Sequence, residues 1–274
     1  MFDIFRRIKL IFDNYELIFR LASKEIKVRY KSPFLGFLWA LLVPLCIIFI
    51  FKIIFSFILR IPIERYPFFL FLTTAVFPWN FFSLSVSNSV LSIQENSNLI
   101  KKIYFPREII PISIILANLV NFILTIILML PIFYLFGMHF DFYILLLLPL
   151  VVFIELIFVT GISLIFSSLQ VYFRDIKYIV EILLFVWFYI TPIFYPLDLV
   201  LNTSKILFKL YMLNPLTQVV TLYRIALLEG YVSQLPMGLD TFWLVITSTG
   251  ISLVTLLLGL YSFKKLEVGF ADLV

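Results

Sequence analysis

The sequence predicts an all-α integral membrane protein, and three observations support this fold class. Apolar residues make up 63% of the 274 residues and charged residues 14%, against about 45–50% and about 25% in soluble domains. The apolar residues gather in six runs of the length that crosses a bilayer, and the basic residues gather in alternate loops. A soluble core cannot bury so large an apolar excess, so the chain needs the bilayer as a second apolar solvent.

Residues 1–31 are predicted to form an amphipathic helix that lies in the membrane interface, and residues 32–274 to form the transmembrane domain. Polar residues recur every three or four positions, which keeps them on one helix face: Arg6, Lys9, Asp13, Glu16, Arg20, Lys24, Lys27 and Lys31. Apolar residues fill the opposite face: Ile8, Ile11, Phe12, Tyr15, Ile18, Phe19, Ala22 and Ile26. A basic amphipathic helix with an aromatic apolar face is typical of the membrane interface.

Six transmembrane helices are predicted, because a span needs about 20 apolar residues. The runs are 34–59, 67–90, 109–136, 142–169, 179–195 and 242–263, of which the fifth is the shortest. Residues 196–240 are moderately apolar and are broken by Pro196, Pro215, Gly230 and Pro236. We expect a pair of short re-entrant helices there, on the outer side and shielded by protein.

The distribution of basic residues predicts that both termini are cytoplasmic. With the N-terminus inside, 15 of the 21 Lys and Arg residues fall in the inner segments and five in the outer ones, Arg224 among the five. This asymmetry is typical of a multi-pass protein of the cytoplasmic membrane with an even number of spans. The net charge of +5 is therefore explained without a nucleic-acid partner.

Composition and motifs argue against several kinds of chemistry. One Cys and one His are too few for a disulfide scaffold, a thiolate or histidine metal site, or a His-based catalytic triad. The G-x-x-x-x-G-K-[ST] phosphate loop does not occur, so we expect this chain to bind no nucleotide and no metal cofactor itself. If transport is driven by ATP, a separate subunit must bind ATP and Mg.

Three charged residues lie within predicted spans, of which Glu181 is only a turn from the inner loop and could pair with Lys177. Lys52 is near the outer end of the first span, where its ammonium group can reach the headgroups. Glu155 is in mid-span, where a charge costs at least about 2.5–3.5 kcal/mol. It should therefore face a partner in the protein, a subunit contact or a wet path, and the sequence favours none of the three.

Two short inner loops carry the most distinctive residues. Residues 98–108 mix charge with aromatic side chains, a composition that suits docking on a protein partner, although a basic membrane anchor is the alternative. Residues 170–175 form the second loop, in which Arg174 or Asp175 could bond to backbone at the end of the span. An ordinary capped turn is the alternative there.

The motifs of these loops resemble those of the permease subunits of type-2 ABC exporters of polysaccharides, such as O-antigen, capsule or teichoic acid. The resemblance extends over nearly the whole chain, and it depends on the order and spacing of several short motifs. These are Lys27-Val28-Arg29-Tyr30-Lys31, Leu99-Ile100-Lys101-Lys102, Tyr104-Phe105-Pro106-Arg107-Glu108, Val171-Tyr172-Phe173-Arg174-Asp175, Thr191-Pro192-Ile193, Asn214-Pro215-Leu216, Tyr223-Arg224 and Phe263-Lys264-Lys265. Pro33 stands where the family often has Ser.

The resemblance implies a homodimer that binds two copies of a separate ABC ATPase and moves a lipid-linked polysaccharide between the two permeases. It implies that the coupling segment docks on the ATPase, through Leu99, Lys101, Lys102, Tyr104, Phe105, Pro106, Arg107 and Glu108. A second cytoplasmic contact or loop would involve Lys27, Arg29, Arg174 and Asp175.

Aromatic residues make up 19% of the chain, and sugars pack their C–H faces on aromatic rings. Following the resemblance, which places the path near the first and fifth spans, the predicted path residues are Tyr30, Phe34, Phe37, Phe185, Phe188 and Tyr189. Each of them could equally serve lipid contact or packing.

The sequence is therefore interpreted as the membrane subunit of an ATP-driven exporter of a lipid-linked polysaccharide, without enzymatic activity of its own. The alternative within transport is an ABC permease for drugs or small lipids. The alternative from another class is a membrane glycosyltransferase or polymerase that acts on lipid-linked sugars and needs converging acidic residues. A structural membrane scaffold is a further alternative, which would not need the composition of the inner loops.

Overall fold

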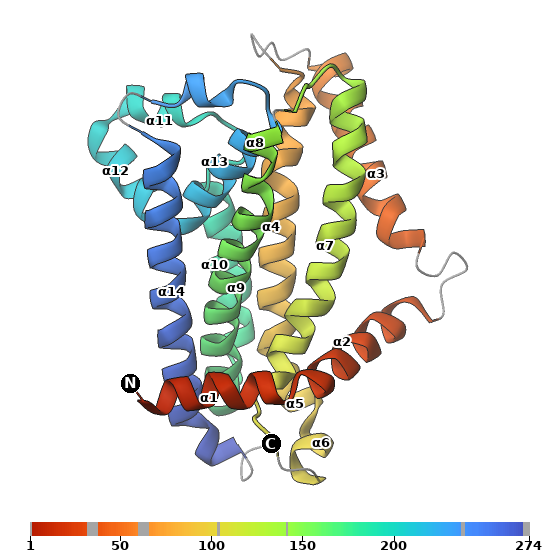
Figure 1. The fold of residues 1–274 in the computed structure, drawn as a ribbon, viewed down its shortest axis with the longest axis vertical. Helices are drawn as coiled ribbons and strands as arrows, with labels where there is room; N and C mark the ends of the chain where they lie inside the picture. The colour runs from red at the N-terminus through yellow and green to blue at the C-terminus, as the bar shows by residue number, and fades with distance from the viewer. Residues whose placement is uncertain are drawn as a thin grey trace.

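The computed structural model describes residues 2–31, 38–59, 66–102, 105–140, 142–236 and 239–270, and every regular element in these ranges is a helix. Long helices stand side by side as a bundle, with two helices across one end and short helices at the other (Figure 1). We call the end that holds α1 and α6 the α1 end. The predicted all-α fold class is confirmed.

The predicted interface helix forms as two helices, α1 (Phe2–Asp13) and α2 (Tyr15–Tyr30), which meet at Asn14. Both run across the bundle rather than along it (Figure 1). Ile18 and Ala22 are buried against the bundle, whereas Phe12 and Phe19 are 72% and 64% exposed. Part of the predicted apolar face therefore packs on protein, and part is exposed.

Four predicted spans form long apolar helices, α4 (Phe68–Val90), α7 (Ile109–Leu135), α9 (Leu147–Tyr172) and α14 (Thr241–Leu266). By length and composition, four helices of the described residues can cross a membrane. The chain is therefore an all-α multi-pass membrane protein. Short helices connect or extend the long ones: α5 (Ser92–Glu95), α6 (Ser97–Lys102), α8 (Phe142–Leu145) and η4 (Glu267–Gly269).

The first and fifth predicted spans differ from the other four. The first consists of α3 (Trp39–Phe51) and a π-helical continuation, η2 (Lys52–Ile58), in which the Lys52 ammonium lies 4.7 Å from the ring centroid of Phe136. The fifth, α10 (Ile176–Ile190), has 15 residues. At 1.5 Å per residue it is about 22 Å long, shorter than the hydrocarbon core of about 30 Å.

Residues 196–240 hold three α-helices where the sequence predicted a pair. They are α11 (Leu197–Thr203), α12 (Lys205–Leu213) and α13 (Pro215–Leu227), followed by the 3-10 turn η3 (Tyr231–Gln234). The Ser204 hydroxyl caps α12, and the Asn214 side chain caps α13, so polar side chains separate three helices. All of α13 is buried, including Arg224, which is therefore a charge held inside the protein.

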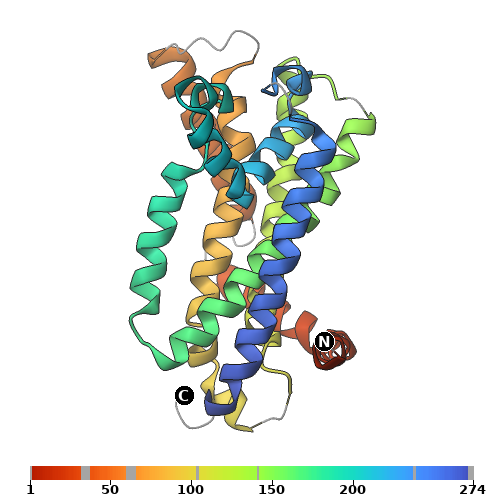
Figure 2. The same ribbon diagram turned by 90° about the vertical axis from the view of Figure 1, so that its left-hand side faces the viewer.

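Of the four long apolar helices α4 is the most buried, and α9 and α14 pack closely against each other. A Cβ atom added at Gly259 of α14 would lie 2.5 Å from the carbonyl oxygen of Gly161 in α9. Two helices can approach so closely only where side chains are absent. By contrast, α10 stands at one edge of the bundle (Figure 2) and buries only Val180 and Leu184.

Candidate functional site

The predicted coupling segment lies at the α1 end, between α5 and α7. Lys101 and Lys102 are exposed at the end of α6, and Leu99 and Pro106 are half-buried. Phe105 and Glu108 are buried, and Tyr104 lies outside the described residues. The segment therefore presents its two lysines outward and anchors itself through Phe105 and Glu108.

Arg7 of α1 joins the coupling segment to the end of the chain. Its guanidinium forms ion pairs with Glu108, whose side chain is fully buried, and with Glu267 of η4. Burial raises the pKa of Glu108, and the charge of Arg7 opposes only part of that shift. Breaking such a buried pair by removing one partner costs about 3–5 kcal/mol.

Arg107 holds the same C-terminal turn from the other side. Its Nη1 donates to the backbone oxygen of Glu267 at 2.6 Å, and its guanidinium lies 5.8 Å from the ring centroid of Phe270. The Tyr172 hydroxyl donates to the Leu266 oxygen at 2.8 Å. The Arg107 and Glu108 side chains thus have partners inside the molecule, which separates them from the outward-facing Lys101 and Lys102.

The loop between α9 and α10 is organised by Gln170, not by the two residues that the sequence singled out. Asp175 is the N-cap of α10 but makes no side-chain cap hydrogen bond, and Arg174 is exposed. Gln170 donates its amide to the Arg174 oxygen at 3.2 Å and accepts from the Lys177 N–H at 2.8 Å. The loop is therefore a turn capped by a residue that lies inside α9, and the contact through Arg174 and Asp175 stays a prediction.

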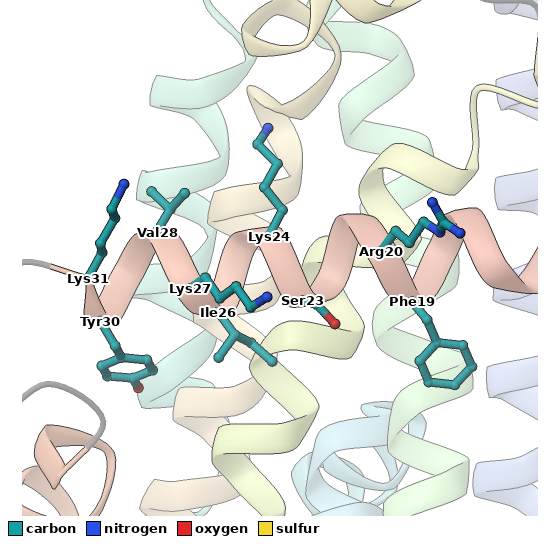
Figure 3. Close-up of a pocket in the computed structure, with 9 residues that line it drawn as sticks. All are labelled: Phe19, Arg20, Ser23, Lys24, Ile26, Lys27, Val28, Tyr30 and Lys31. Atoms are coloured by element: carbon teal, nitrogen blue, oxygen red, sulfur yellow. The ribbon is translucent and has the colours of Figure 1, made fainter.

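The basic face of α2 is open. Figure 3 shows Lys24, Val28 and Lys31 on one edge of the helix and Phe19, Ile26 and Tyr30 on the opposite edge. Lys27 is exposed. Arg29 is exposed overall, yet its Nη2 donates to Asn118 Oδ1 of α7 at 2.8 Å. Lys27 is thus available to a partner, whereas Arg29 also ties α2 to the bundle.

Three of the six predicted path residues meet on α10. Phe185 and Tyr189 are 64% and 57% exposed, and their ring centroids lie 5.2 Å apart. The ring centroid of the half-buried Phe188 lies 5.4 Å from the ring centroids of both Tyr189 and Trp79 of α4. Tyr30 does not join them: it donates to Asn121 Oδ1 of α7 at 3.1 Å and lines a different cavity. Phe34 and Phe37 lie outside the described residues.

The aromatic residues of α10 form one wall of a groove of about 500 Å³, which we call the α10 groove. Its opposite wall is α4, with Phe51 of α3 at one side. Polar residues of α4 were missed by the sequence reasoning: Asn80, Ser83 and Ser87 line the groove together with Glu181 of α10. Their spacing of three and four inside an apolar run is the signal that could have found them.

A network of polar side chains fixes the end of α10 that carries Tyr189. The buried Arg224 of α13 donates to the oxygens of Pro192 and Ile193 at 2.7 and 3.0 Å. Asn214 accepts from Trp187 Nε1 at 2.9 Å and donates to the Thr191 hydroxyl at 3.1 Å. The turn after α10 is therefore held against the start of α13, and the groove has a fixed wall.

Glu155 finds its partner inside the protein. The Tyr223 hydroxyl of α13 donates to Glu155 Oε2 at 2.6 Å, and both side chains are buried. Of the three sequence-based alternatives, the structure favours the protein partner. The described residues contain no group of three or more His, Cys, Asp or Glu that could hold a metal ion.

Known proteins are similar in sequence to this chain over most of its length. The model of the family described as ABC-2 type transporter matches residues 16–228. The chain belongs to the ABC-2 type transporter family. This confirms the family that the loop motifs predicted.

Curated relatives of this ABC-2 transporter cover between 79% and 95% of the chain. An O-antigen export system permease protein RfbA from Klebsiella pneumoniae is 32% identical over 260 residues, which is 95% of each chain. A protein of the same name from Myxococcus xanthus is 34% identical over 79% of this chain and 83% of its own. The polysialic acid transport protein KpsM from Escherichia coli is 30% identical over 90% of this chain and 92% of its own.

Proposed function

We propose that this ABC-2 transporter is the transmembrane subunit of an exporter that carries a lipid-linked polysaccharide across the cytoplasmic membrane. The observation that carries the proposal is the 95% coverage of both chains in the match to an O-antigen export permease. A match of that extent includes both the α10 groove and the coupling segment. The match to a polysialic acid transport protein supports a polysaccharide rather than a drug or a small lipid.

The α10 groove is the proposed glycan path within one protomer. Exposed rings of Phe185 and Tyr189 offer faces for sugar C–H groups, and Asn80, Ser83 and Ser87 offer hydrogen-bonding partners for sugar hydroxyls. Contacts of this kind are weak one at a time and are not strongly directional, so a polymer can slide past them. No residue of the path is required to break a bond.

The groove is open along α3 and α10, and a second copy of the chain would close it. Exposed apolar side chains on these helices include Phe49, Ile50, Ile182 and Phe185. A homodimer that buries this face would form a path between the two permeases. Each permease would have six spans, with α11–α13 re-entrant on the outer side. The complete burial of α13 agrees with the requirement that re-entrant backbone be shielded by protein, whereas α12 buries none of its residues.

Lys101 and Lys102 are the proposed outward contact to a separate ABC ATPase, two copies of which would bind ATP and Mg. Lys27 of α2 would contribute a second contact, and Arg174 and Asp175 of the exposed α9–α10 loop a third. With the α1 end in the cytoplasm, α1, α2 and the coupling segment lie on the side where ATP is available. Arg7 would carry motion of the coupling segment to α1.

The test is purification of the chain from its native host in a mild detergent, followed by mass spectrometry of the bound proteins and glycolipids. Equimolar recovery of a nucleotide-binding subunit with a retained glycan lipid is the expected result. Recovery of that subunit without any glycan lipid would favour a permease for drugs or small lipids. An intact preparation with no nucleotide-binding subunit would contradict the proposal and favour a membrane enzyme.

A further inference from the structure

Among the described residues that line the α10 groove, one carries a charge, Glu181 of α10. Its side chain is exposed. The spacing of four residues in the sequence allowed an ion pair with Lys177, but the structure has no such pair. The Lys177 ammonium lies instead 4.6 Å from the ring centroid of Tyr178. The Glu181 carboxylate is therefore free to meet whatever enters the groove.

The position of Glu181 indicates that its part of the groove holds water. Glu181 comes five residues after Ile176, the first residue of α10, and is thus about 7.5 Å along the helix. A carboxylate that faces hydrocarbon is strongly disfavoured, and charged side chains within spans almost always face a partner, a water-filled cavity or a substrate pathway. Since Glu181 has no partner in the described chain, the groove itself is the favoured surrounding.

The polar and aromatic side chains of the groove are ordered along its length. The helix α4 leads to α5 and α6 at the α1 end, whereas α10 leads away from that end (Figure 2). On α4, Trp79 precedes Ser83 and Ser87, and on α10, Glu181 precedes Tyr189 by eight residues, or about 12 Å. The part of the groove nearest the α1 end therefore contains Ser83, Ser87 and Glu181, which we call the polar mouth.

The polar mouth offers acceptors for the hydroxyl groups of a sugar. An ionised carboxylate accepts hydrogen bonds and donates none. The half-buried Ser87 makes no hydrogen bond within the described chain, and the Ser83 hydroxyl donates to the Asn80 oxygen at 3.3 Å, which leaves its own oxygen able to accept. A neutral sugar can donate to all three groups. A sugar that carries a carboxylate or a phosphate group brings a like charge to Glu181 and is repelled.

We propose that Glu181 makes the polar mouth selective for glycans with uncharged repeats, and that it disfavours glycans whose repeats carry carboxylate or phosphate groups. The inference rests on the proposed function, because it needs the α10 groove to be the glycan path. A lipid carrier brings its phosphate past the mouth once for each polymer, whereas a polyanionic glycan brings a charge with every repeat. The selection therefore acts on the glycan rather than on its carrier.

The test measures the binding of two glycan probes to the full-length chain, in its complex where one forms, in phosphatidylcholine nanodiscs. One probe is a neutral dextran oligomer, and the other is a polysialic acid oligomer with the same number of sugars and the same dye. Fluorescence anisotropy gives the Kd of each probe. The quantity compared is the ratio of the polysialic acid Kd to the dextran Kd, and its change between variants cancels attraction to basic residues elsewhere in the chain.

Glu181→Gln keeps an acceptor for sugar hydroxyls but removes the charge. It is expected to lower the ratio about fivefold, the equivalent of about 1 kcal/mol, through tighter binding of polysialic acid. Ser87→Asp places a second negative charge on the opposite wall and is expected to raise the ratio about fivefold. Glu95→Gln is the matched control, because Glu95 is exposed in α5 and does not line the groove. Tyr189→Ala should weaken both probes equally, since an aromatic ring contacts sugars regardless of their charge.

Two results would overturn this inference and leave the proposed path in place. One is binding of both probes that Tyr189→Ala weakens, with a ratio that neither Glu181→Gln nor Ser87→Asp changes. The other is a ratio that falls as far in Glu95→Gln as in Glu181→Gln, which would indicate a general effect of net charge. Binding of neither probe, or binding that Tyr189→Ala does not weaken, would overturn the proposed path and the inference with it. If Glu181→Gln does not fold, Ser87→Asp against Glu95→Gln decides the question.

Discussion

Two neighbouring helices, α4 and α10, show how differently this protein uses its apolar residues. In the most apolar 18-residue window of α4, 83% of residues are buried within the protein. The 15 residues of α10 bury only Val180 and Leu184, and Ile182 and Phe185 are 65% and 64% exposed. The first helix therefore packs mainly within the protein, apart from the side chains that line the α10 groove. The second presents its side chains to whatever lies outside the protomer, which is where a transport path needs adaptable contacts.

The comparison extends to the α1 end. There Arg7, Arg107 and Glu108 are engaged inside the molecule, whereas Lys101 and Lys102 face outward. Both regions, the α4–α10 pair and the α1 end, thus combine residues packed inside the protein with residues exposed on its surface. Variants of anchored residues are expected to affect folding, and variants of presented residues are expected to affect function in a folded protein.

The largest effect is expected at the contact of α9 and α14. Gly259→Ala would place a Cβ 2.5 Å from the Gly161 oxygen, a backbone atom that cannot move away alone. We expect a loss of about 3 kcal/mol in the free energy of unfolding, at the upper end of overpacking effects. Thermal unfolding in detergent measures it. Gly250→Ala, on the same helix with nothing within 4 Å, is the control and should leave stability unchanged or higher. Equal melting of the two variants would refute the close packing.

The next effect concerns the presented lysines. Lys101→Ala with Lys102→Ala should lower recovery of the ATPase about tenfold, because two lost ion pairs of about 0.7 kcal/mol each amount to one order of magnitude in affinity. Co-purification at fixed salt measures it. Arg107→Ala is the informative comparison, since its effect should be on melting rather than on recovery. Wild-type recovery from the double variant would remove these lysines from the contact.

A smaller effect is expected in the α10 groove. Tyr189→Ala removes an exposed ring from the path and should reduce glycan export about fivefold, since an aromatic contact is worth about 0.5–1.5 kcal/mol. Association with the ATPase should not change. Ile179→Ala, exposed on the same helix but outside the groove, is the control. Export that falls equally in both variants would indicate a general effect on α10.

The smallest effect is a pH dependence at the α1 end. Burial raises the pKa of Glu108, so the folded protein binds this proton more tightly than the unfolded chain does. The free energy of unfolding should then fall as the pH rises from the ordinary Glu pKa, about 4.3, through the raised value. Glu108→Gln should flatten this slope, and Glu95→Gln, exposed in α5, should not. Melting temperatures between pH 4.5 and 8 check it, and an unchanged slope in Glu108→Gln would contradict the assignment.

The positions of the helices could be predicted, because each helix depends on the pattern of apolar residues within its own segment. Periodicity located the helical residues of α1 and α2, although not the break at Asn14, and apolar runs located α4, α7, α9 and α14 within a few residues of their ends. The predicted fourth span also included the separate helix α8. Ser204 is the N-cap of α12, so a new helix begins where the sequence predicted no boundary. The prediction used the average apolar content of residues 196–240 and did not consider this single capping residue.

Long-range pairings were beyond the sequence. Glu155 meets Tyr223 from 68 residues away, and Arg7 meets Glu267 from 260 residues away. Neither pair has a spacing that helix geometry could indicate. Arg224 belongs to a moderately apolar segment, and the hydrogen bonds to Pro192 and Ile193 that permit its burial cannot be read from that segment alone. Tyr30 and Tyr189 were both predicted to line the path, and only the packing shows that Tyr189 lines the α10 groove while Tyr30 contacts α7.

The most direct test of the account is depletion of this chain in its native host, followed by fractionation of the lipid-linked glycan. The account predicts that full-length lipid-linked glycan accumulates in the cytoplasmic membrane while the cell surface loses it, and that the wild-type chain restores export. Unchanged surface glycan, or accumulation of short unfinished lipid-linked sugars, would contradict it, and the second result would identify a polymerising enzyme instead.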